Sequence, residues 1–156
     1  MLAFAVTILL GLITGLLINF LTKLGGKEES RRIFKGWKTT IDKRGFTSWV
    51  SEPFYVNDCF RGEFEWLTIN LHSIAYFWVY EVEEEYPHLI KRDAFVSPPP
   101  AYIEKEGVWY GDTFGVPSPH PNKMEGLYIV RVAIPEGVKI QWKVTVEQAV
   151  YKEVSW

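Results

Sequence analysis

The ten residues VKIQWKVTVE, at positions 138–147, alternate between apolar and polar side chains without a break. Successive side chains of a β-strand point to opposite faces of the sheet, so this stretch predicts a strand with one buried face. A similar alternation runs through residues 128–134, and the turn Pro135-Glu136-Gly137 separates the two runs. A short glycine-containing turn between two alternating runs predicts a β-hairpin.

Further strands are predicted upstream of this hairpin. Residues 63–71 and 74–82 are two of them, and the second is apolar on both faces, as expected of a central strand that is covered on each side or lies near an interface. The segments 97–100 and 116–121 are rich in proline, which lacks the donor that a central strand needs, and we expect loops there. Shorter candidate strands are 33–41, 47–56, 101–103 and 108–110.

No convincing amphipathic helix follows residue 32, whereas short strands and turn signals alternate as far as Trp156. The glycine-flanked segment 111–115 is interpreted as one of these turns. This pattern predicts a mainly β protein in which residues 33–156 form an antiparallel β-sandwich of jelly-roll-like type.

The first 22 residues contain no charged side chain. As a helix they would extend about 33 Å at about 1.5 Å per residue, which matches the roughly 30 Å hydrocarbon core of a bilayer. A cleaved signal peptide would need a basic start and a small-x-small cleavage site, and neither is present. We therefore expect a single-pass transmembrane helix at 1–24, surrounded by membrane lipid, and a charged linker at 25–32.

Basic residues follow the predicted helix and none precedes it, which bears on the orientation of the protein in the membrane. The positive-inside rule places the domain in the cytoplasm, whereas an all-β architecture favours the extracytoplasmic side. The basic residues are interpreted as a stop-transfer flank or as contacts to anionic lipid headgroups. They are Lys23, Lys27, Arg31, Arg32, Lys35 and Lys38.

Small and polar residues recur every four positions along the predicted helix and form one stripe on its surface. Small residues let two membrane helices approach closely, and glycines spaced by four are the minimal pattern for a right-handed helix pair. We expect this face to pack against another copy of the chain or against a different subunit. Its residues are Ala3, Thr7, Gly11, Gly15 and Asn19.

Composition and motifs restrict the classes of function. A net charge of -2 and 47% hydrophobic residues exclude a disordered chain and a nucleic-acid binder that relies on bulk positive charge. The single cysteine, Cys59, allows no intramolecular disulfide, and His72, His88 and His120 lack the spacing of metal ligands. No nucleophile elbow, P-loop or dinucleotide fingerprint occurs. We expect no catalytic residues, no cofactor and no metal.

Two groups of residues leave alternatives open. Glu81, Glu83 and Glu85 lie at strand spacing, where they either bind a cation or a basic partner or form a solvated strand end neutralised by Lys91 and Arg92. Aromatic residues next to glycine and proline loops either pack beneath those loops, contact a protein, or form a platform for sugar stacking. These aromatic residues are Tyr102, Trp109 and Tyr110.

Together these features predict a non-catalytic, membrane-anchored β-sandwich protein that acts as a structural or accessory subunit of a membrane or surface assembly. The alternative function is a surface module that binds glycans through the loop aromatics. A hydrolase explains few of the features.

Replacing Gly11 and Gly15 together by leucine should weaken association through the predicted helix by one or two orders of magnitude. The added side chains would separate the two backbones, and each lost contact or stranded hydrogen bond of Asn19 costs about 1 kcal/mol, with 1.4 kcal/mol equal to tenfold. Crosslinking or native mass spectrometry in the same membrane measures the effect. Leu10→Ala and Leu17→Ala, off the stripe, are the controls, and unchanged assembly in the double glycine variant would contradict an intramembrane partner.

Overall fold

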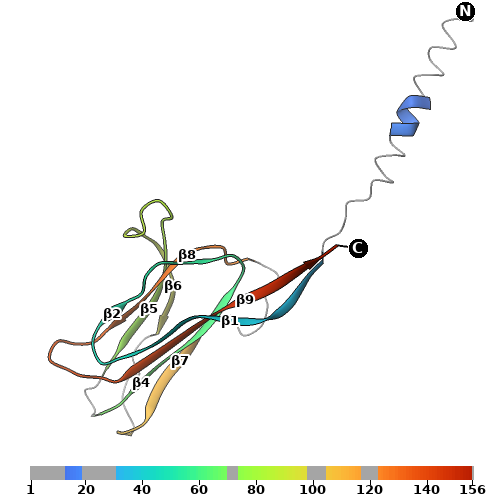
Figure 1. Ribbon diagram of the computed structural model, residues 1–156. Helices are drawn as coiled ribbons and strands as arrows, with labels where there is room; N and C mark the ends of the chain where they lie inside the picture. Colours follow the sequence, from blue (N-terminus) through green and yellow to red (C-terminus); the bar gives the residue numbers. More distant parts are fainter. Residues whose placement is uncertain (1–12, 19–30, 70–73, 98–104, 117–122, 156) are drawn as a thin grey trace, which may run out of the picture. The chain divides into compact units, whose positions relative to one another are not determined.

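The computed structural model describes residues 13–18, 31–69, 74–97, 105–116 and 123–155 (Figure 1). The chain divides into two compact units, one of Met1–Ile33 with Lys152–Trp156 and one of Phe34–Tyr151. In the first unit, residues 13–18 are α-helical, and their large apolar side chains are 51% to 70% exposed. No helix among the described residues combines the length and the apolar character needed to cross a membrane. Most of the predicted anchor, residues 1–12 and 19–24, lies outside the described residues.

From Arg31 onward, the described residues contain nine strands, which form two antiparallel sheets. The first sheet has the order β1-β9-β4-β7, and the second has the order β2-β8-β5-β6, with β3 also paired to β8. The predicted mainly β class and the sandwich of two sheets are therefore confirmed. The strands are β1 (Arg31–Gly45), β2 (Trp49–Val50), β3 (Phe54–Val56), β4 (Phe60–Leu67), β5 (Tyr76–Val82), β6 (Ile90–Ser97), β7 (Trp109–Gly115), β8 (Gly126–Ala133) and β9 (Trp142–Val154).

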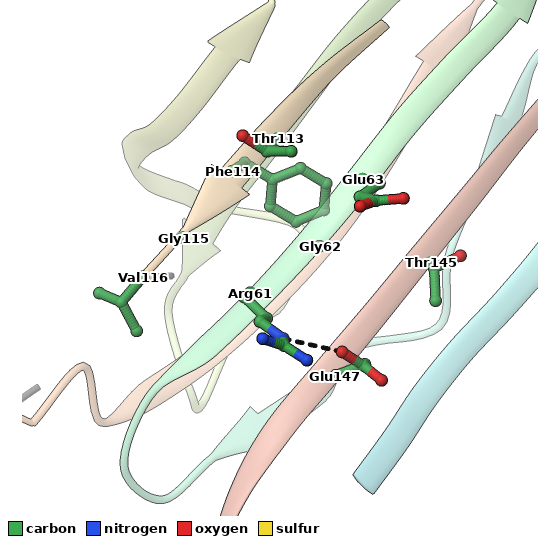
Figure 2. A pocket seen from close by; sticks show the side chains of 9 residues that line it. All are labelled: Arg61, Gly62, Glu63, Thr113, Phe114, Gly115, Val116, Thr145 and Glu147. Atoms are coloured by element: carbon green, nitrogen blue, oxygen red, sulfur yellow. Dashed lines mark hydrogen bonds and ion pairs between the residues drawn. The ribbon is translucent and has the colours of Figure 1, made fainter. Parts of the chain in front are cut away.

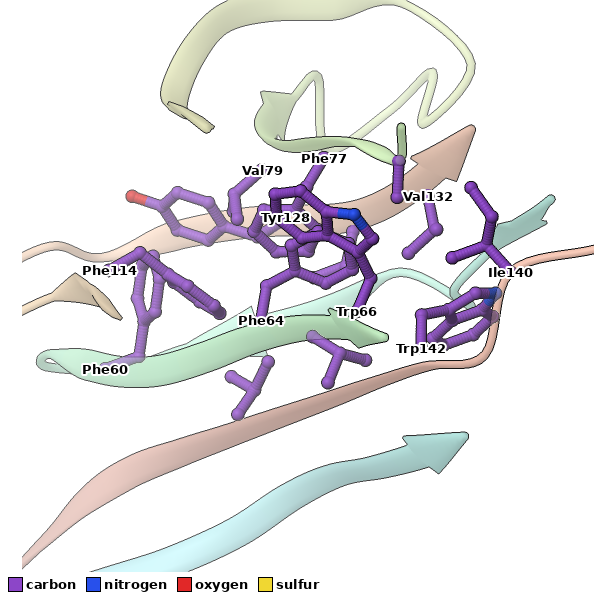
Figure 3. Close-up of a cluster of buried hydrophobic side chains, with 14 of the residues drawn as sticks. Phe60, Phe64, Trp66, Phe77, Val79, Phe114, Tyr128, Val132, Ile140 and Trp142 are labelled. Atoms are coloured by element: carbon purple, nitrogen blue, oxygen red, sulfur yellow. The ribbon is translucent and has the colours of Figure 1, made fainter. Parts of the chain in front are cut away.

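The core lies between the two sheets, where alternate residues of the central strands meet (Figure 3). Along β4, Phe60, Gly62, Phe64 and Trp66 are buried, and the residues that alternate with them face outward. Phe64 stacks on Phe77 of β5 with 4.4 Å between ring centroids and 8° between ring planes. This contact joins the first sheet to the second, since the two rings come from the central strands of different sheets. Aromatic pairs contribute about 0.5–1.5 kcal/mol beyond the burial of their area.

The predicted hairpin between 128–134 and 138–147 is wrong. β8 pairs with β5, β2 and β3, whereas β9 pairs with β4 and lies beside β1 in the other sheet. Residues 134–141 therefore connect the two sheets. Ile140 is fully buried before the strand begins, so the apolar positions of 138–141 pack into the core without ladder pairing.

The segment 111–115, interpreted as a turn, belongs to edge strand β7. Gly111 lies opposite Glu65, and a Cβ there would come 2.1 Å from the Phe64 carbonyl oxygen. Gly115 has a φ of +79° and a similarly close approach to the Phe60 carbonyl oxygen. The glycines are therefore required by close backbone approach, and the turn interpretation failed because glycine also serves this purpose in strands.

Phe64→Ala should lower the free energy of unfolding by about 3–5 kcal/mol, the usual cost of removing a buried phenylalanine. The lost ring leaves Phe77 without its partner across the two sheets. Urea denaturation followed by circular dichroism measures the change. The control is Glu63→Ala, next in sequence on the outer face of the same strand, for which a change within about 0.5 kcal/mol is expected. Equal effects of the two variants would contradict the assignment of Phe64 to the core.

Candidate functional site

The outer faces of the two sheets differ in chemistry. The first sheet carries charged and hydroxyl side chains, and we call this surface the polar face; its residues are Arg61, Glu63, Glu65, Gly111, Thr113, Gly115, Lys143, Thr145 and Glu147, with Trp37 and Trp109 at its margins. The second sheet carries aromatic and aliphatic side chains, and we call this surface the aromatic face; its residues are Val50, Tyr55, Tyr76, Trp78, Tyr80, Val96, Leu127, Ile129 and Arg131, of which Tyr80 is buried.

The polar face contains a cleft of about 500 Å³ over β4, β7 and β9 (Figure 2). Arg61 Nε donates to Glu147 Oε2 at 2.8 Å, and the Arg61 guanidinium lies 4.3 Å from the centroid of the Trp37 ring. The ion pair and the ring restrain the long arginine side chain from two sides. The cleft is therefore bounded by a charged group whose position is restrained before any ligand arrives.

A second ion pair lies further along the same face. Lys143 Nζ is 2.7 Å from Glu65 Oε2, and it also lies 4.6 Å from the centroid of the Trp109 ring. Trp109 remains 39% exposed at the start of β7. The polar face thus extends from the Arg61–Glu147 pair to an accessible aromatic ring.

The aromatic face is organised as a ladder of rings along β5. Tyr76, Trp78 and Tyr80 follow each other at strand spacing with nearly parallel rings, the planes differing by 11° and 10°. The Arg131 guanidinium lies 5.4 Å from the Trp78 ring centroid, directly across the β5–β8 pairing. On the same face Tyr76, Val96 and Val50 are 37%, 41% and 54% exposed. Exposed apolar side chains from three neighbouring strands therefore lie together on the aromatic face.

The acidic residues at the end of β5 separate into two environments. The side chain of Glu81 points inward and is 8% exposed, and it pairs with Arg92 and, at 3.3 Å, with Lys91. Glu83, Glu84 and Glu85 follow the end of the strand and are exposed. They line a cleft of about 580 Å³ together with Glu125. The predicted neutralisation by Lys91 and Arg92 occurs at Glu81.

Burial works to raise the pKa of Glu81, but hydrogen bonds from Arg92 and Lys91 and their positive charges outweigh it and lower the pKa. The same pairing raises the pKa of Arg92. Tyr128 lies directly opposite Glu81 on β8, and burial together with the Glu81 charge raises the pKa of its hydroxyl. These groups therefore form a charged cluster within the end of the sandwich, with the carboxylate and the guanidinium both ionised and the tyrosine neutral at pH 7.

The residues singled out in the sequence are only partly brought together. Trp109 and Tyr110 are consecutive in β7 and point to opposite faces, with Tyr110 packed 6.0 Å from the Trp66 ring in the core. Tyr102 lies outside the described residues, as do Lys23, Lys27, Ala3, Thr7, Gly11 and Asn19. Gly15 is in the described helical segment. Arg31, Arg32, Lys35 and Lys38 are exposed in β1, so the last two residues of the predicted linker already belong to a strand.

Cys59 is a buried free thiol. Within the described ranges, no group of three or more His, Cys, Asp or Glu side chains is placed to hold a metal ion. Comparison with protein-family models, curated proteins and solved structures finds no match to this chain. The chemistry of the two outer faces is therefore the feature of the molecule that bears on its function.

Glu81→Gln should be less stable than the wild type at pH 7, and the difference should shrink as the pH falls. A carboxylate with a lowered pKa in the folded state stabilises the fold above its unfolded pKa, about 4.3, and this contribution is lost as the pH falls through the folded value. Urea denaturation of both proteins at pH 7 and pH 3 measures the difference. A stability gap that stayed constant or widened on acidification would contradict the ion pairing of Glu81.

Proposed function

We propose that the protein is a non-catalytic, membrane-anchored accessory subunit whose sandwich domain docks to a partner protein through the aromatic face. The observation that carries the proposal is the contrast between the two outer faces. A solvated outer face of an antiparallel sheet is normally polar, as the first sheet is where β4 pairs with β7 and β9, whereas the second exposes large apolar side chains in adjacent rows. Exposed apolar surface of this kind is typical of a protein interface.

Charge defines the chemistry of the partner. Arg131 lies within the aromatic face, in a row with Val96, Trp78 and Val50 across four strands. In the described part of the chain its contact is the Trp78 ring, and no carboxylate pairs with it. Tryptophan, tyrosine and arginine are the residues that most often dominate binding energy at interfaces. The partner surface is therefore apolar, with a carboxylate placed opposite Arg131.

The membrane anchor is supported by the uncharged residues 1–22 and by the exposed apolar side chains of the helical segment 13–18. Lipid or another apolar helix would cover such side chains. The small-residue stripe gives the proposed anchor its own contact surface, for a second copy or a different subunit. The subunit would then be held in its assembly at two places.

We infer that the sandwich is a jelly roll, because its pairs are nested along the sequence. β1 lies beside β9, β2 and β3 pair with β8, β4 with β7, and β5 with β6. This is the order produced when one long antiparallel hairpin is rolled into two sheets. In this arrangement the inner faces of both sheets form the core, and their outer faces remain available for contacts.

The alternative function, glycan binding, has one specific observation in its favour. Trp109 presents an exposed ring beside the charged side chains of the polar face. An aromatic ring next to hydrogen-bonding groups is suited to a ligand with both apolar and hydroxyl surfaces. Of the two consecutive aromatics, Tyr110 points into the core, and Trp109 presents its ring to solvent.

Arg131→Glu should weaken the complex with the partner protein about thirtyfold or more, since an unpaired charge at an interface core costs 2 kcal/mol or more. The complex is extracted from native membranes in mild detergent, and native mass spectrometry gives the bound fraction. Lys139→Glu makes the same charge change at an exposed position outside the aromatic face and should have no effect. Equal partner retention by the two variants would reject docking through this face.

A further inference from the structure

The polar face is arranged as a grid of three rows across three strands. The outer rows are Glu147–Arg61–Gly115 and Lys143–Glu65–Gly111, and the middle row is Thr145–Glu63–Thr113. Neighbouring positions in a row belong to adjacent strands, which lie about 4.8 Å apart. We infer that this grid binds a neutral oligosaccharide lying along β7. The inference names the ligand class of the alternative function, and it does not depend on docking through the aromatic face.

The cleft of the polar face covers one half of the grid, where it is lined by Arg61, Glu63, Thr113, Gly115, Thr145 and Glu147. Gly111 and Gly115 supply no side chain on the β7 side, while Arg61, Glu63 and Glu65 stand beside them on β4. Neither glycine tolerates a Cβ, because a Cβ would lie 2.1 Å from the Phe64 carbonyl oxygen at Gly111 and 2.2 Å from the Phe60 carbonyl oxygen at Gly115. The β7 side of the grid therefore carries the Thr113 side chain between two positions that the packing of the strands keeps free of side chains. From Trp109 to Gly115, β7 extends about 20 Å at about 3.3 Å per residue, which suits an elongated ligand.

The middle row supplies side chains whose hydrogen-bonding groups are available to a ligand. Thr113 and Thr145 each offer a hydroxyl that donates and accepts, and Glu63 offers two accepting oxygens between them. Among the described residues no ion pair or hydrogen bond engages the Glu63 carboxylate. Sugar hydroxyls both donate and accept, and they match such a row without bringing a charge.

The outer rows restrain the remaining polar groups. Arg61 is held by Glu147 and Trp37, and Lys143 is held by Glu65 and Trp109. Groups that are already positioned lose less conformational entropy when a ligand binds. The exposed ring of Trp109 at the start of β7 provides an apolar surface for the face of a sugar ring.

The same grid disfavours other ligand classes. It contains three carboxylates, Glu63, Glu65 and Glu147, and two cations, Arg61 and Lys143, so a polyphosphate or an acidic sugar would meet net negative charge. A wholly apolar ligand would leave the carboxylate and hydroxyls of the middle row without partners. A neutral polyhydroxylated chain satisfies both constraints.

The test uses the full chain in detergent micelles, titrated calorimetrically with maltohexaose, cellohexaose, chitohexaose and mannohexaose. At least one of these should bind, and tryptophan fluorescence should change in the wild type. Thr113→Val removes one hydroxyl at constant shape, and Glu63→Gln removes the charge. Each should weaken binding about tenfold, as expected for a lost hydrogen bond to a polar or charged partner. Glu52→Gln, between β2 and β3, is the matched control and should leave affinity unchanged.

Thermal unfolding of every variant establishes that the fold is retained. Absence of binding for all four hexasaccharides at millimolar concentration would overturn the inference, as would binding that is unaffected by both Thr113→Val and Glu63→Gln. Weakening of a partner-protein complex by Thr113→Val without any saccharide binding would also overturn it, because the polar face would then be a protein interface. The Arg131→Glu variant should still bind the saccharide, so the two proposals fail independently.

Discussion

The stack of Phe64 on Phe77 is the contact from which the rest of the domain can be understood. It joins the central strands of the two sheets in the middle of the core, surrounded by fully buried residues of β8 and β9. Once Phe64 faces inward, the alternation of a strand requires Glu63 and Glu65 to face outward. The packing of one aromatic residue therefore determines which side chains of β4 are available to a ligand.

The pairing register of the strands then places outward-facing residues of different strands next to each other. Thr145, Glu63 and Thr113 come from strands far apart in sequence, and they form one row only because β9, β4 and β7 pair in a particular register. A slip of one residue would move every one of these side chains to the opposite face. At Gly111 and Gly115, the close approach of the β4 backbone excludes any residue with a side chain. Phe114 of the same strand packs into the core.

Two features depart from the usual separation of apolar interior and polar exterior, and both have physical consequences. The aromatic face places large apolar side chains outside, where burial against another surface would gain free energy. Glu81 places a carboxylate inside, where it is retained by two cations from β6. A buried charge is tolerated when it is paired and hydrogen-bonded, and the pairing explains why the pKa of Glu81 is lowered despite its burial.

The sequence by itself determined the strand character of most of the chain, because a side chain's position on a pleated strand depends only on the parity of its residue number. The alternation in 142–147 and the doubly apolar strand 76–82 are visible before any folding, and the second already indicated an unusual outer face. Local sequence did not determine which strands pair. The short link between β8 and β9 predicted a hairpin, yet the two strands lie in different sheets, where each pairs with strands distant in sequence. The polar grid depends on that choice, because its rows need β9 beside β4, and so only the tertiary structure decided it.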